Sequence, residues 1–180
     1  TIISTGSIKA QSNNITVGGD WTLNTSNNFN AGTGKVIFNG SSAQTISWQT
    51  SNSRKFKHLQ ISNSDVSLAK NTDISGTLTI DSGKKLDING YNLTAGTLAN
   101  DGNLQLKGSE TLSITTKDID SGTITYDGTE TGLAYGNAYY NLALNTTGTM
   151  TLNADLDVDG SLTITDGTLN TGNNDINVAG

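Results

Sequence analysis

Apolar and polar residues alternate in short runs along the whole chain. Each run places two apolar side chains on either side of a polar one, as in residues 78–80 and 162–164, both LTI. This is the periodicity of a β-strand with one buried face. Dipeptides typical of turns, such as Asn89-Gly90, separate the runs, and the chain has no Pro that would interrupt a backbone ladder. The pattern predicts an all-β protein of many short strands.

Two inward residues per run are few for a two-sheet sandwich but sufficient for the narrow core of a solenoid. Residues 65–96 match residues 149–180 without gaps at 10 of 32 positions, an offset of 84. A second relation matches Phe38 with Tyr126 and Phe56 with Tyr139. We therefore predict a single elongated, right-handed parallel β-helix (β-solenoid) over residues 1–180. It would consist of a partial unit (1–65), a full unit (66–149) and a second partial unit (150–180).

The strand register follows from the same runs. Because alternate side chains point to opposite faces, one register buries the apolar residues of each run and the other exposes them. We expect buried side chains at Leu78, Ile80, Leu162 and Ile164. We expect exposed side chains at Thr79 and Thr163.

Composition narrows the class of protein. Only 33% of the residues are hydrophobic and only 14% are charged, so most of the chain is uncharged and polar. This suits many short strands joined by turns better than it suits disorder, which usually requires high charge. The net charge of −6 argues against a nucleic-acid partner. The chain has no Cys, and no apolar run approaches the ~20 residues of a membrane span. It begins at Thr1, so we expect a processed mature chain or an excised segment.

The repeat texture is clearest in three segments: NITVGGDWTL (14–23), GKVIFNGSSAQTIS (34–47) and DLDVDGSLTITDGTLNTGNN (155–174). It resembles that of long repetitive secreted bacterial proteins, the filamentous-haemagglutinin-like adhesins and autotransporter passengers. The resemblance implies a β-helical stalk or adhesin that is extracellular, on the cell surface. It brings no catalytic residues with it. We accordingly expect an extracellular structural protein.

The ends of the chain repeat each other. Residues 3–19 align without gaps on residues 164–180, an offset of 161. The terminal coils of a solenoid present unpaired strand edges, which other chains can extend. We therefore expect copies to stack head-to-tail into an open filament, with the chain itself as partner. A segment cut from a longer repetitive chain would have the same matching ends. The residues expected at the contact are Ile3, Ile8, Ile15, Val17, Leu169, Ile176 and Val178.

One stretch matches the spacing of a calcium loop. Asp155, Asp157, Asp159 and Asp166 occupy positions 1, 3, 5 and 12, with Gly160 at position 6. Apolar residues alternate with the first three acids, which is typical of a strand with the carboxylates facing solvent. The corresponding residues 71–76 lack two of the acids, so we expect that the fold requires no cofactor. Calcium binding and an acidic solvent face are the two interpretations.

Two tryptophans suggest a second function. Trp21 and Trp48 are candidates for stacking against sugar rings, with Trp21 partly exposed after the turn at Gly18-Gly19. A carbohydrate-binding surface module, with glycans or a host or cell surface as partner, is therefore the alternative to a purely structural role. The competing interpretation is that both rings fill the core.

Three weaker candidates remain. The only Arg and the only His lie in residues 53–58. We interpret this segment either as a loop that enters a strand or as a contact for an anion. Recurrent Thr-x-Thr pairs, such as residues 163–165, suggest an ice-binding face, although β-propensity explains them equally well. The sequence shows no triad, phosphate loop or metal-ligand cluster, so we expect no enzymatic activity; a polysaccharide-degrading β-helix enzyme is the enzymatic alternative.

Overall fold

The computed structural model describes residues 2–4, 7–23, 29–48, 55–63, 65–129 and 131–180, and every regular element in them is a β-strand. In chain order the strands are β1 (Ile2–Ser4), β2 (Ile8–Lys9), β3 (Ile15–Val17), β4 (Trp21–Leu23), β5 (Phe29–Asn30), β6 (Lys35–Phe38), β7 (Gln44–Trp48), β8 (Lys55–Phe56), β9 (His58–Ile61), β10 (Val66–Leu68), β11 (Thr72–Ile80), β12 (Lys85–Asp87), β13 (Leu93–Asn100), β14 (Asn103–Leu106), β15 (Leu112–Thr116), β16 (Thr123–Tyr126), β17 (Ala138–Tyr139), β18 (Asn141–Thr151), β19 (Leu156–Val158), β20 (Leu162–Asn170) and β21 (Ile176–Val178).

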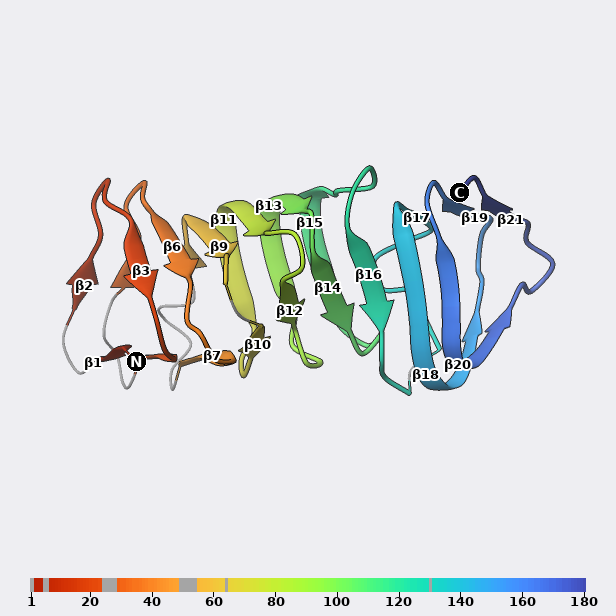
Figure 1. Cartoon of the computed structure of the whole chain (residues 1–180), viewed down its shortest axis with the longest axis horizontal. Coiled ribbons are helices and arrows are strands. Elements are labelled where there is room, and N and C mark those ends of the chain that lie inside the picture. The colour runs from red at the N-terminus through yellow and green to blue at the C-terminus, as the bar shows by residue number, and fades with distance from the viewer. Residues whose placement is uncertain (1, 5–6, 24–28, 49–54, 64, 130) are drawn as a thin grey trace.

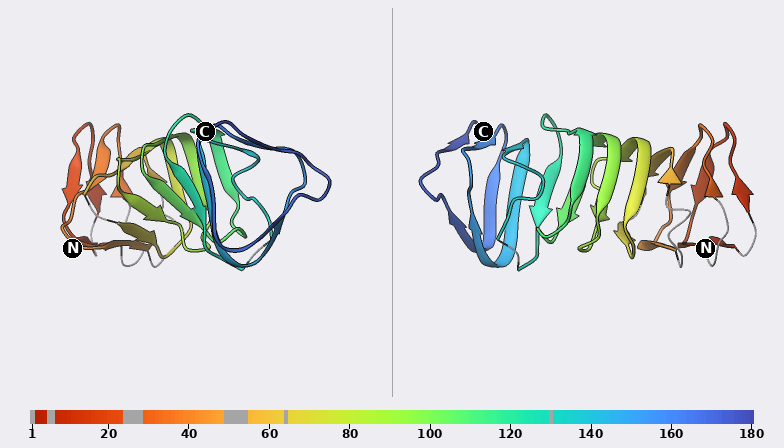
Figure 2. Two further views of the ribbon diagram at one scale, coloured as in Figure 1. Left: turned by 45° about the vertical axis from the view of Figure 1, so that its right-hand side comes forward. Right: turned by 180° about the vertical axis from the view of Figure 1, so that it is seen from behind.

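The strands pair in parallel, each with the strand one coil further along the chain. The largest sheet contains nine of them in the order β1-β4-β7-β10-β12-β14-β16-β18-β20. Successive coils thus stack along one axis, and the two termini lie at opposite ends of an elongated molecule (Figures 1 and 2). The predicted parallel β-solenoid is confirmed.

Each coil passes three walls in turn. Wall A is the nine-stranded sheet. Wall B begins with β2, β5 and β8 and continues through the first parts of β11, β13 and β15, then the last parts of β18 and β20. Wall C contains β3, β6 and β9 and the last parts of β11 and β13, and by chain order it resumes with β17, β19 and β21. Because β11, β13, β18 and β20 bend from one wall to the next, the core is a column enclosed on three sides.

Columns of paired apolar residues fill this core. In wall A one column of register partners runs from coil to coil. Every member except the last is buried. Parallel pairing in register places each inward side chain directly over that of the preceding coil, so each coil shields its neighbour from water. The members are Val66, Leu86, Leu104, Ile124, Leu142 and Leu162.

The expected register is confirmed in the middle of the solenoid and fails at its end. Leu78 and Ile80 are buried, while Thr163 is exposed and Thr79 is partly exposed. Leu162 is only partly buried, and Ile164 is 47% exposed, so the expectation that both are buried is wrong. Both residues lie on β20, which is the outermost strand of wall A, and only one neighbouring coil covers them.

The 84-residue sequence repeat differs from the period of the coils. Register partners in wall A are 18 to 25 residues apart, as in Leu86 with Leu104 and Trp21 with Ile46. Leu78 lies in wall C, whereas its sequence match Leu162 lies in wall A. Two residues that match in the sequence repeat therefore lie four coils and one further wall apart. The predicted boundary at 149/150 falls inside β18 and does not interrupt the ladder.

The side walls are interrupted in two places, and aromatic residues fill both. Among the described residues, β5 pairs only with β2, and β8 only with β11. Phe29 and Phe56 bridge this first interruption, with their ring centroids 5.8 Å apart. Trp21 and Trp48 pack against them, at 4.9 Å from Phe29 and 5.4 Å from Phe56 respectively. The second interruption affects both side walls. Among the described strands, β15 does not pair with the last part of β18 in wall B, and β13 does not pair with β17 in wall C.

Three buried tyrosines fill the second interruption. The Tyr126 and Tyr139 hydroxyls are 3.2 Å apart, the backbone N–H of Tyr135 donates to the Tyr126 hydroxyl (2.8 Å), and the Tyr135 hydroxyl donates to the carbonyl of Asp118 (2.6 Å). Burial raises the pKa of Tyr126 to about 12 and raises the pKa values of Tyr135 and Tyr139 further. The protonated phenols thus supply hydrogen bonds where the side walls lack backbone pairing.

Truncating an inward residue in the middle of the solenoid should cost more than truncating one at its end. We expect Leu78→Ala to lower the free energy of unfolding by about 2–5 kcal/mol, the usual range for a buried leucine. Ile164→Ala should cost clearly less because its side chain is half exposed, and Thr79→Ser should be nearly neutral. Chemical denaturation measures all three. Equal losses at Leu78 and Thr79 would show that the register is reversed.

Alkaline conditions should weaken the fold through the tyrosine cluster. The folded pKa values lie above the unfolded value of about 10, so the stabilisation is complete below pH ~10. It should be lost as the pH rises through the folded value of about 12 for Tyr126. Urea titrations across this range measure the slope. Tyr126→Phe should reduce the pH dependence, whereas Tyr140→Phe, on an exposed ring, should leave it unchanged; a flat profile in the parent would contradict the prediction.

Candidate functional site

The last coil leaves part of the core column open to solvent. Its strands β20 and β21 are outermost in their sheets. Ile164, Ile176 and Val178 are 47%, 37% and 40% exposed, and they are three of the five large exposed hydrophobic residues in the described part of the chain. Leu169, on the last part of β20, is partly buried against the core. An apolar surface of this kind marks a place where another surface can pack.

The preceding coil shows why these side chains are exposed. Leu144 is the register partner of Ile164, Leu156 of Ile176 and Val158 of Val178. All three partners are at most 1% exposed, although they occupy the same ladder positions. The difference is that a further coil covers them. The open end therefore presents the same face that every earlier coil presents to the coil after it.

The first coil forms the opposite end of the molecule. Its strands β1, β2 and β3 each pair on one side only, with β4, β5 and β6. Val17 is buried, whereas Ile8 and Ile15 are partly buried and pack against the core. The predicted assembly residues thus form two groups, one in each terminal coil.

The ladder revises one of the predicted matches between the two ends. In wall A, the column of register partners that ends at Ile164 in the last coil includes Trp21 near the first coil. Trp21 in turn pairs with Ile2. Ile3, the predicted equivalent of Ile164, pairs instead with Thr22, whose neighbours on both sides point into the core. Ile2, not Ile3, is therefore the register partner of Trp21, and the assembly role of Ile3 stays a prediction.

Charge is distributed unequally along the solenoid axis. Residues 1–64 contain five of the ten basic residues and only one of the sixteen acids, a net charge of +4. Residues 65–180 carry −10, and residues 150–180 contain five acids and no basic residue. These five Asp side chains are all exposed. The two ends of the molecule therefore have opposite charge.

The predicted calcium loop is a strand in the structure. Asp157 lies within β19, and its carboxylate accepts a hydrogen bond from the Asn177 amide (3.1 Å). Asp155 accepts one from the backbone N–H of Asp175, and Asp166, on β20, accepts one from the N–H of Gly167. Within the described ranges no group of three or more His, Asp or Glu side chains is arranged to hold a metal. Calcium binding by Asp155, Asp157, Asp159 and Asp166 stays a prediction, and the strand does not curl around a shared point.

Both tryptophans face the core. Trp21 is fully buried and Trp48 is 3% exposed, so the expectation of a partly exposed Trp21 is wrong. The indole N–H of Trp48 donates to the carbonyl of Asn71 (3.2 Å). The rings fill the first interruption of the ladder together with the two phenylalanines. Neither offers an exposed face on which a sugar could stack.

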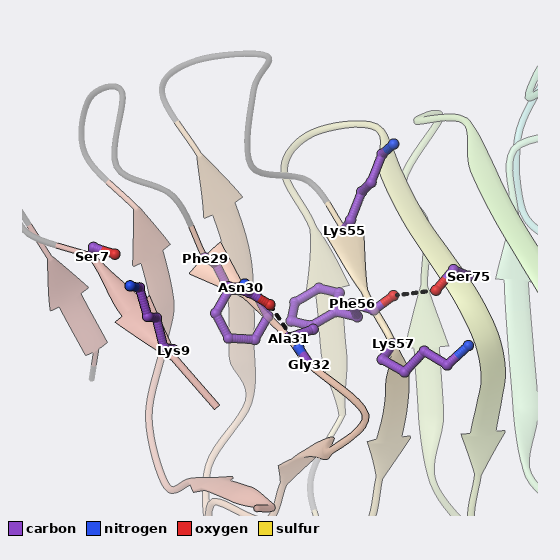
Figure 3. Close-up of a pocket in the computed structure, with 10 residues that line it drawn as sticks. All are labelled: Ser7, Lys9, Phe29, Asn30, Ala31, Gly32, Lys55, Phe56, Lys57 and Ser75. Carbon is purple, nitrogen blue, oxygen red and sulfur yellow. Dashed lines mark hydrogen bonds between the residues drawn. The ribbon is translucent and has the colours of Figure 1, made fainter. Parts of the chain in front are cut away.

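The basic segment contributes to an open pocket in the first three coils. Lys55 and Lys57 lie on one side of it and Lys9 on the other, with the rings of Phe29 and Phe56 between them (Figure 3). Arg54 lies outside the described residues. The sequence placed Lys55 and Lys57 together, but Lys9 is 46 residues earlier and only the coil geometry brings it to the same wall. His58 is turned elsewhere, and its Nδ1 accepts a hydrogen bond from the N–H of Thr77 (3.0 Å).

No protein-family model matches this chain, and no curated protein or solved structure matches it either. None of the described residues belongs to a helix long and apolar enough to cross a membrane.

Substitution of a tryptophan should reveal a structural role. We expect Trp48→Ala to lower the free energy of unfolding by about 3–5 kcal/mol, because it removes a large buried ring. Denaturant titration measures this loss, and a glycan array on the folded variant measures binding. Tyr140→Ala is the control, since it removes an exposed ring. A Trp48→Ala protein of unchanged stability that had lost binding to a glycan would restore the sugar-stacking interpretation.

Proposed function

We propose that this chain is a non-catalytic structural rod of the cell exterior, a filament subunit or adhesin stalk whose copies stack head-to-tail. The observation that carries the proposal is the open last coil. Ile164, Ile176 and Val178 are exposed at ladder positions where the preceding coil buries its residues completely. A second copy would cover them with its first coil.

Hydrophobic burial and strand pairing would hold such a contact together. Burying a Val or Ile side chain completely contributes about 1.5–3 kcal/mol, so covering three half-exposed residues contributes a few kcal/mol. The outer strands β20 and β21 would gain parallel partners in β1 and β3 of the next copy, which are themselves paired on one side only. A contact between two different ends does not close on itself, and it therefore propagates as an open filament.

Charge favours the same polarity of stacking. The acidic last coils of one copy would approach the basic first coils of the next, while contacts between like ends would repel. Such complementarity steers encounter and fixes orientation more than it adds affinity. It therefore supports a head-to-tail arrangement over a head-to-head or tail-to-tail dimer.

The sequence, rather than the solenoid fold, supports the proposed location on the cell surface. The repetitive segments resemble those of secreted bacterial adhesins and autotransporter passengers, and the composition is rich in uncharged polar residues. A rod that holds its shape through a continuous ladder suits the role of a spacer. The absence of catalytic activity is part of this proposal.

Serine substitutions at the open end should block assembly. We expect the parent chain to form particles whose size grows with concentration, seen as filaments by electron microscopy and as growing mass by light scattering. Ile176→Ser combined with Val178→Ser should remain monomeric, because it removes two of the three exposed apolar side chains while leaving the preceding coil intact. Asn177→Ser, on the outward face between them, is the matched control and should assemble as the parent does.

Salt should slow the association of the parent, since exposed charges are screened within about 10 Å at 0.1 M ionic strength. A parent chain that stays monomeric at high concentration would refute the proposal. So would a double serine variant that assembles as readily as the control.

A further inference from the structure

The pocket at the first interruption of wall B has the features of a ligand site. It has a volume of about 480 Å³, within the range of ~300–1,000 Å³ usual for small-molecule sites. It lies between β5 and β8, which do not pair with each other in the described part of the chain. The side chains of Phe29 and Phe56, which are 7% and 0% exposed, form its base. The base is therefore rigid and packed into the core.

The side chains around this base are basic or neutral. Lys9 lies on one side and Lys55 and Lys57 on the other, and none of the lining residues is acidic (Figure 3). The ion pairs found among the described residues, Lys85 with Asp65 and Lys107 with Asp127, lie elsewhere. The pocket is thus lined by three lysines, whose side chains extend in different directions, in a protein whose net charge is −6.

A neighbouring titratable group responds to one of these lysines. The pKa of His58 is lowered first by burial and then by the positive charges of Lys57 and of Lys35, which lies outside the pocket. Residues 1–64 contain a single acid, Asp20, and the acid nearest in register is Asp73, the partner of Lys55 on β11. A local positive potential on an acidic protein concentrates anions at one place.

Uncharged donors complete the surroundings. Asn30 uses its side-chain oxygen to accept the N–H of Gly32 (3.0 Å), which leaves its amide group as a donor. Ser75, at the far edge, has its hydroxyl 3.5 Å from the carbonyl of Phe56. Ammonium, amide and hydroxyl groups side by side suit a ligand that carries both negative charge and hydroxyls.

The second interruption of the ladder provides an internal comparison. There the Tyr135 ring occupies the gap and the Lys117 ammonium lies over it, 5.1 Å from the ring centroid. The same ammonium donates to the carbonyl of Tyr135. The lysine at that interruption is thus engaged with the protein itself, whereas the three at the first line an open pocket.

We propose that this pocket binds an acidic oligosaccharide, with its carboxylate or sulfate groups between Lys9 on one side and Lys55 and Lys57 on the other. Strands of successive coils lie about 4.8 Å apart, so the strands that carry Lys9 and Lys55, two coils apart, are separated by at least roughly 10 Å. One ligand spanning them would therefore extend along the solenoid axis. The pocket opens on a side wall, so the proposal is independent of end-to-end stacking.

Titration with defined sugars tests the proposal. The probes are a sulfated tetrasaccharide, a tetramer of uronic acid, a neutral tetrasaccharide of glucose, and inorganic sulfate, each measured by calorimetry or by chemical-shift changes. We expect both acidic sugars to bind and the neutral sugar to bind at least about tenfold more weakly. Sulfate alone should bind weakly, because it reaches one side of the pocket at a time. Binding should weaken as the salt concentration rises.

Two matched double variants separate the pocket from net charge. Lys9→Gln with Lys55→Gln should weaken binding of the acidic sugars about tenfold or more. Lys70→Gln with Lys84→Gln removes the same charge at a distance and should change the affinity less than about twofold. Circular dichroism verifies that both variants fold. Equal losses in the two variants, equal binding of neutral and acidic sugars, or no binding of any sugar would each overturn the proposal. Tighter binding of a short nucleic acid than of either acidic sugar would overturn it as well.

Discussion

The rest of this structure depends on one constraint: parallel strands of successive coils pair in register. The pairing places every inward side chain directly above the one in the coil before it, so that a side chain is buried only if the next coil is present. The column from Val66 to Leu142 shows the consequence, because five coils contribute five buried apolar residues at one position. Two inward residues per wall are then sufficient for a continuous core.

The need for pairing in register also explains why the large aromatic residues lie at the interruptions of the side walls. Where two successive coils of the described chain do not pair along a side wall, no backbone ladder fills the space between them. Large rings fill that space at both interruptions, with Trp and Phe at the first and Tyr at the second. The tyrosine hydroxyls also supply hydrogen bonds that the backbone no longer makes. The interruptions are therefore stabilised by packing, and only the first leaves an open, lysine-lined pocket.

The proposed functions use different parts of one rod. The ends carry unpaired strands, exposed apolar residues and opposite charges, which suits stacking of identical copies. The side wall near the N-terminal end carries the lysines around the pocket, which suits a ligand that approaches from the side. A rod of this design keeps its shape between the two because most of its contacts join neighbouring coils.

The class of fold and the local register follow from the pattern of residues along the chain. Alternation, turn dipeptides and the absence of Pro were sufficient because a strand with one buried face has a period of two, whatever its neighbours are. Leu78, Ile80 and Thr79 accordingly lie as expected. The repeat of 84 residues is a property of the sequence, and it does not reveal how many walls a coil has.

Which residues share a wall, and which coil lies last, depend on how the coils stack in three dimensions. Leu78 and Leu162 have the same local sequence and lie on different walls, because 84 residues amount to four coils and one wall. Trp21 is buried and Ile164 exposed because burial depends on the neighbouring coil rather than on the side chain. Lys9 and Lys55 lie on the same wall because the chain completes two coils between them. Periodicity along the chain specifies the face of each strand, but the length of every turn between strands decides where the next strand falls on the coil.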